Sequence, residues 1–290
     1  MSWRTVVVSK SAKLDYQLGY LVVRRDTTTK IHLSEISILM IETTAVSLTA
    51  SLLCELIKRK IKVIFCDEKR NPSSELVPYY GCHDTSIKIR KQIEWKAEEK
   101  SLIWTEIVAE KIRKQADLLK SLRKLEYKML NQYLMELEPG DATNREGHAA
   151  KVYFNALFGM DFTRTADTSV NAALNYGYGI ILSTINREIA ANGYITQIGI
   201  FHDNMFNPFN LGSDLMEPFR PIVDKKVIDM MPKHFDHNEK MMLLTILEKE
   251  VLIGGKRECI NNAIKIYCKS VFDALNDKDP SLIKFYSNEL

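Results

Sequence analysis

The stretch E-K-R-N-P-S-S-E-L-V-P, residues 68–78, decides the fold class of this chain, because the hydrophobic pattern differs on its two sides. It combines Pro, Ser and Asn with four charged residues, a composition typical of a connection between domains. Short β-like runs precede it and long helical patterns follow it. We therefore predict an α+β protein: a small antiparallel β-rich domain over residues 1–67, a linker over 68–82 and a larger all-α domain over 83–290.

The N-terminal part contains short runs of β-branched residues separated by turn-forming residues. Spacing this close leaves no room for crossover helices, so we expect mainly antiparallel pairing. A helix with leucines on one side is predicted to begin at Ser47 and to end at the basic residues 58–60. The strands are expected over residues 5–8, 13–16, 20–23, 30–33, 36–41 and 62–66.

Beyond the linker, apolar residues recur at spacings of three and four for most of the remaining length. Basic clusters such as K-I-R-K at 111–114 alternate with glutamates, which indicates solvated helix faces rather than a DNA-binding stripe. The small residues of A-A-L-N-Y-G-Y-G, 172–179, favour close packing of two helices, with contact of Tyr176 to nucleic acid as the alternative. Helices are expected over residues 88–110, 111–137, 143–157, 168–191, 214–231, 238–253 and 259–276.

The composition is that of a soluble globular protein, with 46% hydrophobic and 27% charged residues. No apolar run is long enough to cross a bilayer and no signal peptide is recognisable, so we expect a cytoplasmic protein without membrane association. The net charge of +3 permits nucleic-acid binding without requiring it. Five cysteines without a C-x-x-C pair indicate reduced thiols, and Cys82-His83 lacks the second pair that a zinc site needs.

Three polar segments contain the strongest candidates for chemistry: Glu146 in E-G-H-A-A-K-V-Y-F, His202 in G-I-F-H-D-N, and Glu217 in S-D-L-M-E-P-F-R-P. Two carboxylates and one imidazole suit Mg²⁺ or Mn²⁺, because carboxylate oxygens are hard ligands and an imidazole moves the preference towards Mn²⁺. The three residues are scattered, so they form a site only if folding brings them together. Such a site indicates an enzyme that acts on phosphate esters.

Two of these residues also have an explanation without catalysis. Thr143 and Glu146 fit a capping box, in which each side chain satisfies a backbone N–H at the start of a helix. A lone histidine beside an apolar run is often a hydrogen-bonded structural residue. His202, however, is expected in a polar loop, where functional groups are common.

The segment around Glu217 is the hardest to explain by structure alone. Asp214 and Glu217 can share one face at a helix start, where a cap accounts for part of the pattern. Pro218 and Pro221 constrain the backbone that carries the carboxylates. Arg220 follows at once and can pair with a carboxylate or with a phosphate. The segment is therefore predicted to belong to a site.

Four motifs in this order, E-G-H-A-A-K-V-Y-F, A-L-N-Y-G-Y-G, G-x-x-H and D-L-M-E-P-F-R-P-I-V-D, resemble the CRISPR-associated integrases of the spacer-acquisition machinery. The resemblance covers essentially the whole chain, and its length and spacing are most like the type II-A branch. It implies that Glu146, His202 and Glu217 bind a divalent metal, with Asp214 as a candidate of second rank. It also implies an endonuclease and integrase that inserts short DNA fragments into a CRISPR array, by attack of 3′-hydroxyls on phosphodiester bonds, in antiviral adaptive defence.

The same resemblance implies the partners. It predicts a homodimer, with dimerisation through the N-terminal domain, and an assembly of two such dimers on one dimer of a small partner protein, a 4:2 complex. Double-stranded fragments and array DNA are the substrates, and type II-A accessory proteins are further partners. We expect Arg145, Lys151, Tyr176 and Arg220 to contact DNA.

Two other functions compete with this one on the sequence alone. A non-catalytic scaffold that binds DNA for another enzyme would account for the capping patterns. A metal-dependent hydrolase of small phosphate esters would need a closed pocket, which the sequence does not reveal.

Overall fold

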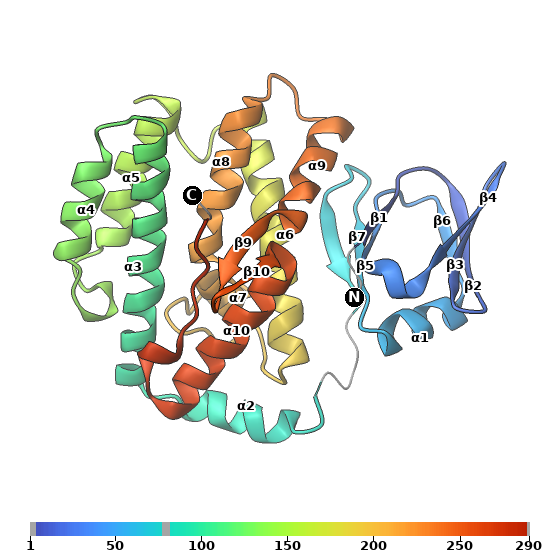
Figure 1. The fold of residues 1–290 in the computed structure, drawn as a ribbon, viewed down its shortest axis with the longest axis horizontal. Coiled ribbons are helices and arrows are strands. Elements are labelled where there is room, and N and C mark those ends of the chain that lie inside the picture. Colours follow the sequence, from blue (N-terminus) through green and yellow to red (C-terminus); the bar gives the residue numbers. More distant parts are fainter. Residues whose placement is uncertain (1–3, 77–81, 289–290) are drawn as a thin grey trace. The chain divides into compact units, whose positions relative to one another are not determined.

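The chain forms two compact units, Met1–Gly81 and Cys82–Leu290, in a computed structural model that describes residues 4–76 and 82–288 (Figure 1). The first unit is β-rich and the second is mostly helical, so the predicted α+β class is confirmed. The first unit extends 14 residues beyond the predicted end of its domain at residue 67 (81 − 67 = 14).

The first unit contains two four-stranded sheets, in the orders β1-β5-β7-β8 and β4-β3-β2-β6. In the first sheet β5 pairs in parallel with both β1 and β7, which corrects the prediction of mainly antiparallel strands. The reason is the route of the chain: β2, β3 and β4 of the second sheet form the connection from β1 to β5, and β6 with the helix over residues 50–58 forms the connection from β5 to β7. The strands are β1 (Arg4–Val8), β2 (Ala12–Gln17), β3 (Tyr20–Arg24), β4 (Thr28–His32), β5 (Ile36–Ile41), β6 (Val46–Leu48), β7 (Lys62–Cys66) and β8 (Pro72–Glu75).

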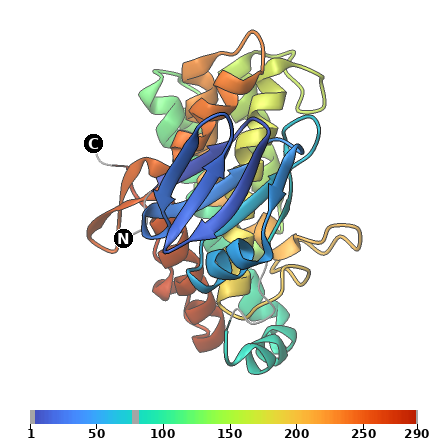
Figure 2. The same ribbon diagram turned by 90° about the vertical axis from the view of Figure 1, so that its right-hand side faces the viewer.

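A single apolar core joins the two sheets and the helix α1 (Ala50–Lys58), which lies beside them in Figure 2. Leu14 and Leu39 from the two sheets and Leu52 and Leu56 of α1 are all fully buried in it. The prediction of a helix beginning at Ser47 is wrong, because residues 46–48 pair with β2 as a strand. The helix begins after its N-cap Thr49, whose side chain accepts the N–H of Leu52.

The predicted linker over 68–82 contains the strand β8, which pairs antiparallel with β7. The polar residues before it form the turn of a hairpin: the N–H of Asn71 donates to the carboxylate of Asp67 at 2.8 Å, and Arg70 has a φ of 62°. Pro72 begins an edge strand, a place where a residue without an N–H is tolerated. Turns and linkers share the same composition, so the pattern alone could not separate them.

The second unit is organised around the long helix α3, which contacts α4, α5, α8 and α10, and around α6, which contacts α7 to α10 (Figure 1). The predicted division of α3 at residues 110 and 111 is wrong, because the helix continues through that point without interruption. The helices are α2 (Thr85–Glu94), α3 (Ala97–Ser121), α4 (Tyr127–Met135), α5 (Arg145–Phe158), α6 (Ser169–Ala191), α7 (Asn210–Leu215), α8 (Arg220–Met230), α9 (His237–Leu244) and α10 (Ile260–Asp277).

The second unit is not all-α as predicted. A two-stranded antiparallel hairpin, β9 (Glu250–Ile253) and β10 (Lys256–Cys259), replaces the end of the helix expected over 238–253. Gly254 and Gly255 form its turn with φ values of 58° and 77°, a conformation that two consecutive glycines adopt without strain. The Gly-Gly pair is therefore the signal that the periodicity obscured.

Close packing of α6 on α8 accounts for the small residues of 172–179. A Cβ at Gly177 would overlap the side chain of Val223, so only glycine permits this approach. The favoured interpretation of that segment as a helix contact is confirmed. No helix in residues 4–76 and 82–288 has the length and apolarity of a membrane span.

Candidate metal centre

A buried lysine on α3 lies at the centre of the candidate site. The ammonium of Lys111 forms ion pairs with Oε1 of Glu146 and with Oε2 of Glu217, and the side chain is only 7% exposed. Burial lowers the pKa of Lys111, but the two carboxylates outweigh it and raise the pKa above its ordinary value. Sequence reasoning placed Lys111 on a solvated face and so missed it. The apolar residues Ile107 and Val108, one turn earlier on α3, were the signal that this face is buried.

Glu146 lies in the first turn of α5 and is not part of a capping box. The N-cap of α5 is Asn144, and the carboxylate of Asp141 accepts the N–H groups of Arg145 and Glu146 at 2.6 and 3.1 Å. Thr143 does not cap this helix. Because Asp141 performs the capping, the carboxylate of Glu146 is left to contact Lys111. The capping-box interpretation of Glu146 is therefore wrong.

Glu217 is held at a fixed position between two cations. It begins a 3-10 turn, Glu217–Phe219, that leads directly into α8, and its side chain is 5% exposed. The guanidinium of Arg220 donates from Nε to Oε1 at 2.8 Å. Burial alone would raise the pKa of Glu217, but the charges of Arg220 and Lys111 prevail and lower it to about 2. Glu217 is therefore a carboxylate at any physiological pH.

The side chain and backbone of His202 are both hydrogen-bonded to Asp214. Asp214 is fully buried, and its Oδ1 lies 2.6 Å from Nδ1 of His202 and accepts the N–H of His202 at 3.0 Å. Its Oδ2 accepts the N–H groups of Ile200 and Phe201 at 2.6 and 3.1 Å. A Cβ at Gly199 would lie 2.7 Å from Oδ2, so glycine there permits the approach. Both oxygens of Asp214 are engaged in fixing the loop, and its role as a second-rank ligand stays a prediction.

The imidazole of His202 is also fixed by aromatic contacts. Its ring meets Trp104 of α3 edge-on at 5.8 Å between centroids, and Trp104 stacks on Phe201 at 4.5 Å. The hydrogen bond with Asp214 raises the pKa of His202, against the opposing effect of burial. Sequence reasoning missed Trp104, which gives no local signal because it lies 98 positions before His202 (202 − 104 = 98).

The fold brings Glu146 and Glu217 to one cation, although they are 71 positions apart (217 − 146 = 71). His202 interacts electrostatically with Glu217, which contributes to the raised pKa of the imidazole. The three residues are not among the groups whose ligand atoms lie within 4.8 Å of one another in the described part of the chain. Their donor set nevertheless fits Mg²⁺ or Mn²⁺, because two carboxylates already hold a cation and no described residue is hydrogen-bonded to Nε2 of His202.

A buried hydroxyl network supports Arg220 from the other side. The guanidinium lies 4.7 Å above the ring centre of Tyr178, and the hydroxyls of Tyr178 and Tyr153 donate to the two oxygens of Asp224. Burial raises the pKa of Asp224 to about 6, although the two tyrosines and Arg220 oppose the shift. The segment that carries Glu217 is thus held by side chains from α5, α6 and α8.

We expect Asp224 to make the stability of the protein depend on pH. Its folded pKa of about 6 exceeds its ordinary value of 3.8. Its contribution is therefore complete below about pH 3.8 and is lost as the pH rises through 6, by about 3 kcal/mol in the free energy of unfolding. Urea unfolding of wild type and Asp224→Asn from pH 4 to 7.5 measures this, because the difference between the two curves should change by that amount. A difference that is independent of pH would contradict it.

Tyr176 lies at a buried position on α6. It is 4% exposed and its ring packs against Phe235 at 5.6 Å, with the ammonium of Lys240 5.5 Å from the ring centre. This face of α6 is covered by α9 and by the residues that precede it. The contact of Tyr176 with DNA stays a prediction, which this burial does not support. No local sequence signal indicated the burial, because Phe235 lies 59 positions after Tyr176 (235 − 176 = 59).

The three predicted basic contacts differ in accessibility. Lys151 is exposed on α5. Arg145 is paired at 3.1 Å with Glu136, the C-cap of α4. Arg220 is committed to Glu217. Lys151 is therefore the most accessible of the three for contact with a phosphate, whereas the guanidinium of Arg220 is already paired with the carboxylate of Glu217.

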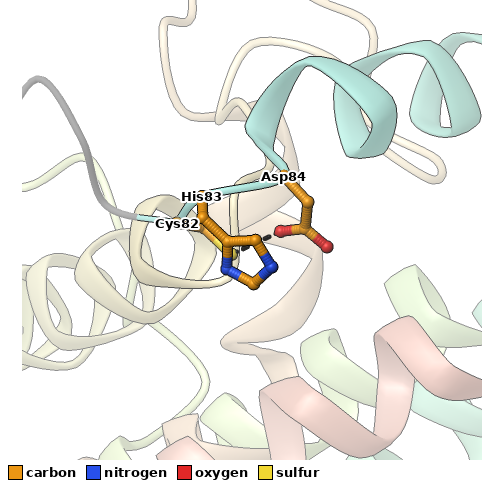
Figure 3. A group of neighbouring side chains, drawn as sticks. All are labelled: Cys82, His83 and Asp84. Atoms are coloured by element: carbon orange, nitrogen blue, oxygen red, sulfur yellow. Dashed lines mark hydrogen bonds between the residues drawn. The ribbon is translucent and has the colours of Figure 1, made fainter.

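A second group of potential ligands precedes α2. The ligand atoms of Cys82, His83 and Asp84 lie within 4.8 Å of one another, and Figure 3 shows the three side chains together. The thiol of Cys82 donates to Asp84 at 2.6 Å, and the ammonium of Lys88 lies 3.3 Å from the same carboxylate. A cation and a thiol hydrogen bond thus already satisfy Asp84, so the group has a structural explanation at the start of a helix.

Comparison with known proteins shows the family of this chain. The family model described as "CRISPR associated protein Cas1" matches residues 5–253. The CRISPR-associated endonuclease Cas1 of Neisseria meningitidis serogroup C (strain 8013) is 34% identical over 232 residues, which cover 79% of this chain and 76% of that protein.

Two solved structures share the fold. One is a casposase bound to integration product, with a TM-score of 0.77, 18% identity and coverage of 96% of this chain and 92% of that one. The other is a chain of a Cas6-RT-Cas1–Cas2 complex, with a TM-score of 0.72, 19% identity and coverage of 97% of this chain and 36% of that one. Because the family model spans most of its length, this chain belongs to the Cas1 family of CRISPR-associated endonucleases.

Proposed function

We propose that this chain is a metal-dependent DNA integrase and endonuclease that inserts short DNA fragments into a CRISPR array by attack of 3′-hydroxyls on phosphodiester bonds. The observation that carries the proposal is the convergence of Glu146 and Glu217 on one buried cation, beside Arg220. The Neisseria relative named an endonuclease and the fold shared with a casposase bound to integration product support it.

Each residue of the site has a distinct role in this proposal. Glu146, Glu217 and His202 would hold Mg²⁺ or Mn²⁺, which when bound would polarise the scissile phosphate and lower the pKa of the attacking hydroxyl. Asp214 binds Nδ1 and so leaves Nε2 as the nitrogen that would be available to a metal. Arg220 fixes the carboxylate of Glu217 in one orientation. Preorganisation of this kind matters because in-line attack tolerates little error in position.

A non-catalytic DNA scaffold is the second candidate, and buried ion pairs occur in such proteins as well. The burial of the Glu217 side chain argues against the scaffold function. Burying a charged cluster costs several kcal/mol in desolvation, and apolar side chains of the same size would serve a purely structural role better. The cluster is therefore better explained by chemistry than by stability.

The assembly and its location are part of the proposal. We expect a homodimer that binds double-stranded fragments and array DNA, in a 4:2 complex with a dimer of a small partner protein. The fold shared with a chain of a Cas6-RT-Cas1–Cas2 complex supports a partner of the Cas2 kind. We further propose a cytoplasmic location and, from the length and spacing of the motifs, membership of the type II-A branch with its accessory proteins.

Strand transfer by the purified protein tests the proposal directly. With partner protein, a fragment duplex, array DNA and Mn²⁺ or Mg²⁺, joined product should form, and EDTA should abolish it. His202→Ala removes a candidate ligand and is expected to lower the rate by at least about 100-fold, the upper end of the effect of losing a ligand's support. The exposed His234→Ala is the matched control and should retain full activity. Product that forms equally in EDTA, or with His202→Ala, would instead support the scaffold.

A further inference from the structure

The two carboxylates of the candidate site are electrically balanced by side chains of the protein itself. Glu146 and Glu217 supply two negative charges, and Lys111 and Arg220 supply two positive charges. Asp214 is engaged by His202 and by three backbone N–H groups, and the carboxylate of Asp141 accepts the N–H groups at the start of α5. No net negative charge therefore remains at the two carboxylates to attract a divalent cation.

Lys111 holds the place that a metal ion would take. Its ammonium contacts both predicted carboxylate ligands, one oxygen from each. A divalent ion between these oxygens would either displace the ammonium or bring two further positive charges beside it in a poorly solvated site. Like charges at such short range repel by several kcal/mol at an effective dielectric constant of about 20.

Lys114, one turn later on α3, is a lysine with a structural role and serves as a comparison for Lys111. Lys114 donates to the backbone carbonyl of Tyr286 at 2.6 Å, pairs with Glu110 at 2.9 Å and lies over the Tyr286 ring. It thus attaches the C-terminal segment to α3. Lys111 instead has both of its ion pairs with the predicted ligands, so its position serves the site rather than the fold.

We propose that Lys111 is a built-in counter-ion that couples metal binding to DNA binding. Without DNA it occupies the space between the carboxylates and keeps metal affinity low. When DNA binds, the phosphate adds negative charge, attracts the ammonium away from the carboxylates and makes room for the metal. As a consequence, the metal is held tightly only when a substrate phosphate is already present. DNA that is not bound as a substrate is thereby protected from cleavage. This inference rests on the proposed function, because it concerns the same metal site.

Mn²⁺ binding to the full chain, measured by titration calorimetry and by the EPR signal of free Mn²⁺, tests it without any activity readout. For wild type, a saturating duplex with phosphorothioate ends should tighten Mn²⁺ binding by 10-fold or more. By reciprocity, Mn²⁺ should tighten binding of the duplex by the same factor. Lys111→Met should bind Mn²⁺ 10-fold or more tightly than wild type without DNA, and the duplex should then add little. Lys120→Met removes an exposed charge from the same helix and should behave as wild type.

The outcomes separate the inference from the proposed function. Equal or weaker Mn²⁺ binding by Lys111→Met would overturn the counter-ion role, as would wild-type affinity that is the same with and without DNA. Absence of Mn²⁺ binding in wild type even with DNA would instead overturn the metal site itself. If Lys111→Met does not fold, Lys111→Gln keeps donors for both carboxylates without the charge, and the same difference is expected.

Discussion

Glu217→Gln is expected to reduce strand transfer by on the order of 1000-fold. The substitution removes the negative charge of a buried candidate ligand. It leaves the cations of Arg220 and Lys111 opposite a neutral amide. Loss of a metal ligand removes several kcal/mol of transition-state stabilisation, and about 4 kcal/mol corresponds to that factor. The rate of product formation with Mn²⁺, measured by gel under single-turnover conditions, gives the number.

Stability must be followed beside activity, because Glu217 is buried. Removing one partner of a buried pair typically costs about 3–5 kcal/mol, so the melting temperature of the variant should fall. Activity is therefore compared at a temperature where circular dichroism shows both proteins folded. Glu248→Gln, at an exposed site in the same unit, is the matched control and should have no effect. Wild-type rates from folded Glu217→Gln would remove Glu217 from the site.

Asp214→Asn is expected to lower stability and to weaken the metal site without abolishing it. Each oxygen of the carboxylate has two of these contacts, with three backbone N–H groups and Nδ1 of His202 in total. In Asp214→Asn one oxygen becomes an amide nitrogen, which cannot accept, so two hydrogen bonds are lost. Hydrogen bonds to a charged group contribute about 1.5–3 kcal/mol each, so a loss of about 3 kcal/mol and a melting temperature about 10 °C lower are expected. Loss of such support for a ligand lowers metal affinity by about 10- to 100-fold.

The size of the effect distinguishes support from direct coordination. If Asp214 supports His202, its variant should bind Mn²⁺ weakly but measurably, and the defect should recover at high metal concentration. If Asp214 were itself a ligand, Asp214→Asn would match Glu217→Gln and would not recover. Asp161→Asn, at an exposed position in the same unit, should leave both melting temperature and metal affinity unchanged.

Much of the secondary structure was predictable, because the spacing of apolar residues and the capping residues determine helices and strands locally. The strand over Ile36–Ile41 and the helix over Ser169–Ala191 were found within a residue or so, since an unbroken apolar run and a capped helical period are strong local signals. The parallel pairing of β5 with β1 was not predictable in the same way, because it depends on strands of a second sheet forming the connection. The hairpin β9–β10 was missed because a helical period continued into it.

The sequence by itself determined which residue types were available for chemistry, and the order of the motifs that carry Glu146, His202 and Glu217. The sequence could not assign a role to each of these residues, because a carboxylate near the start of a helix can be either a helix cap or a metal ligand. Only the tertiary structure decided that Asp141 caps α5, that Asp214 holds His202, and that Lys111 stands between Glu146 and Glu217. The physical reason is that charge and desolvation act through space and not along the sequence. Lys111 lies 35 positions before Glu146 and 106 before Glu217 (146 − 111 = 35; 217 − 111 = 106), so no local sequence pattern predicts either ion pair.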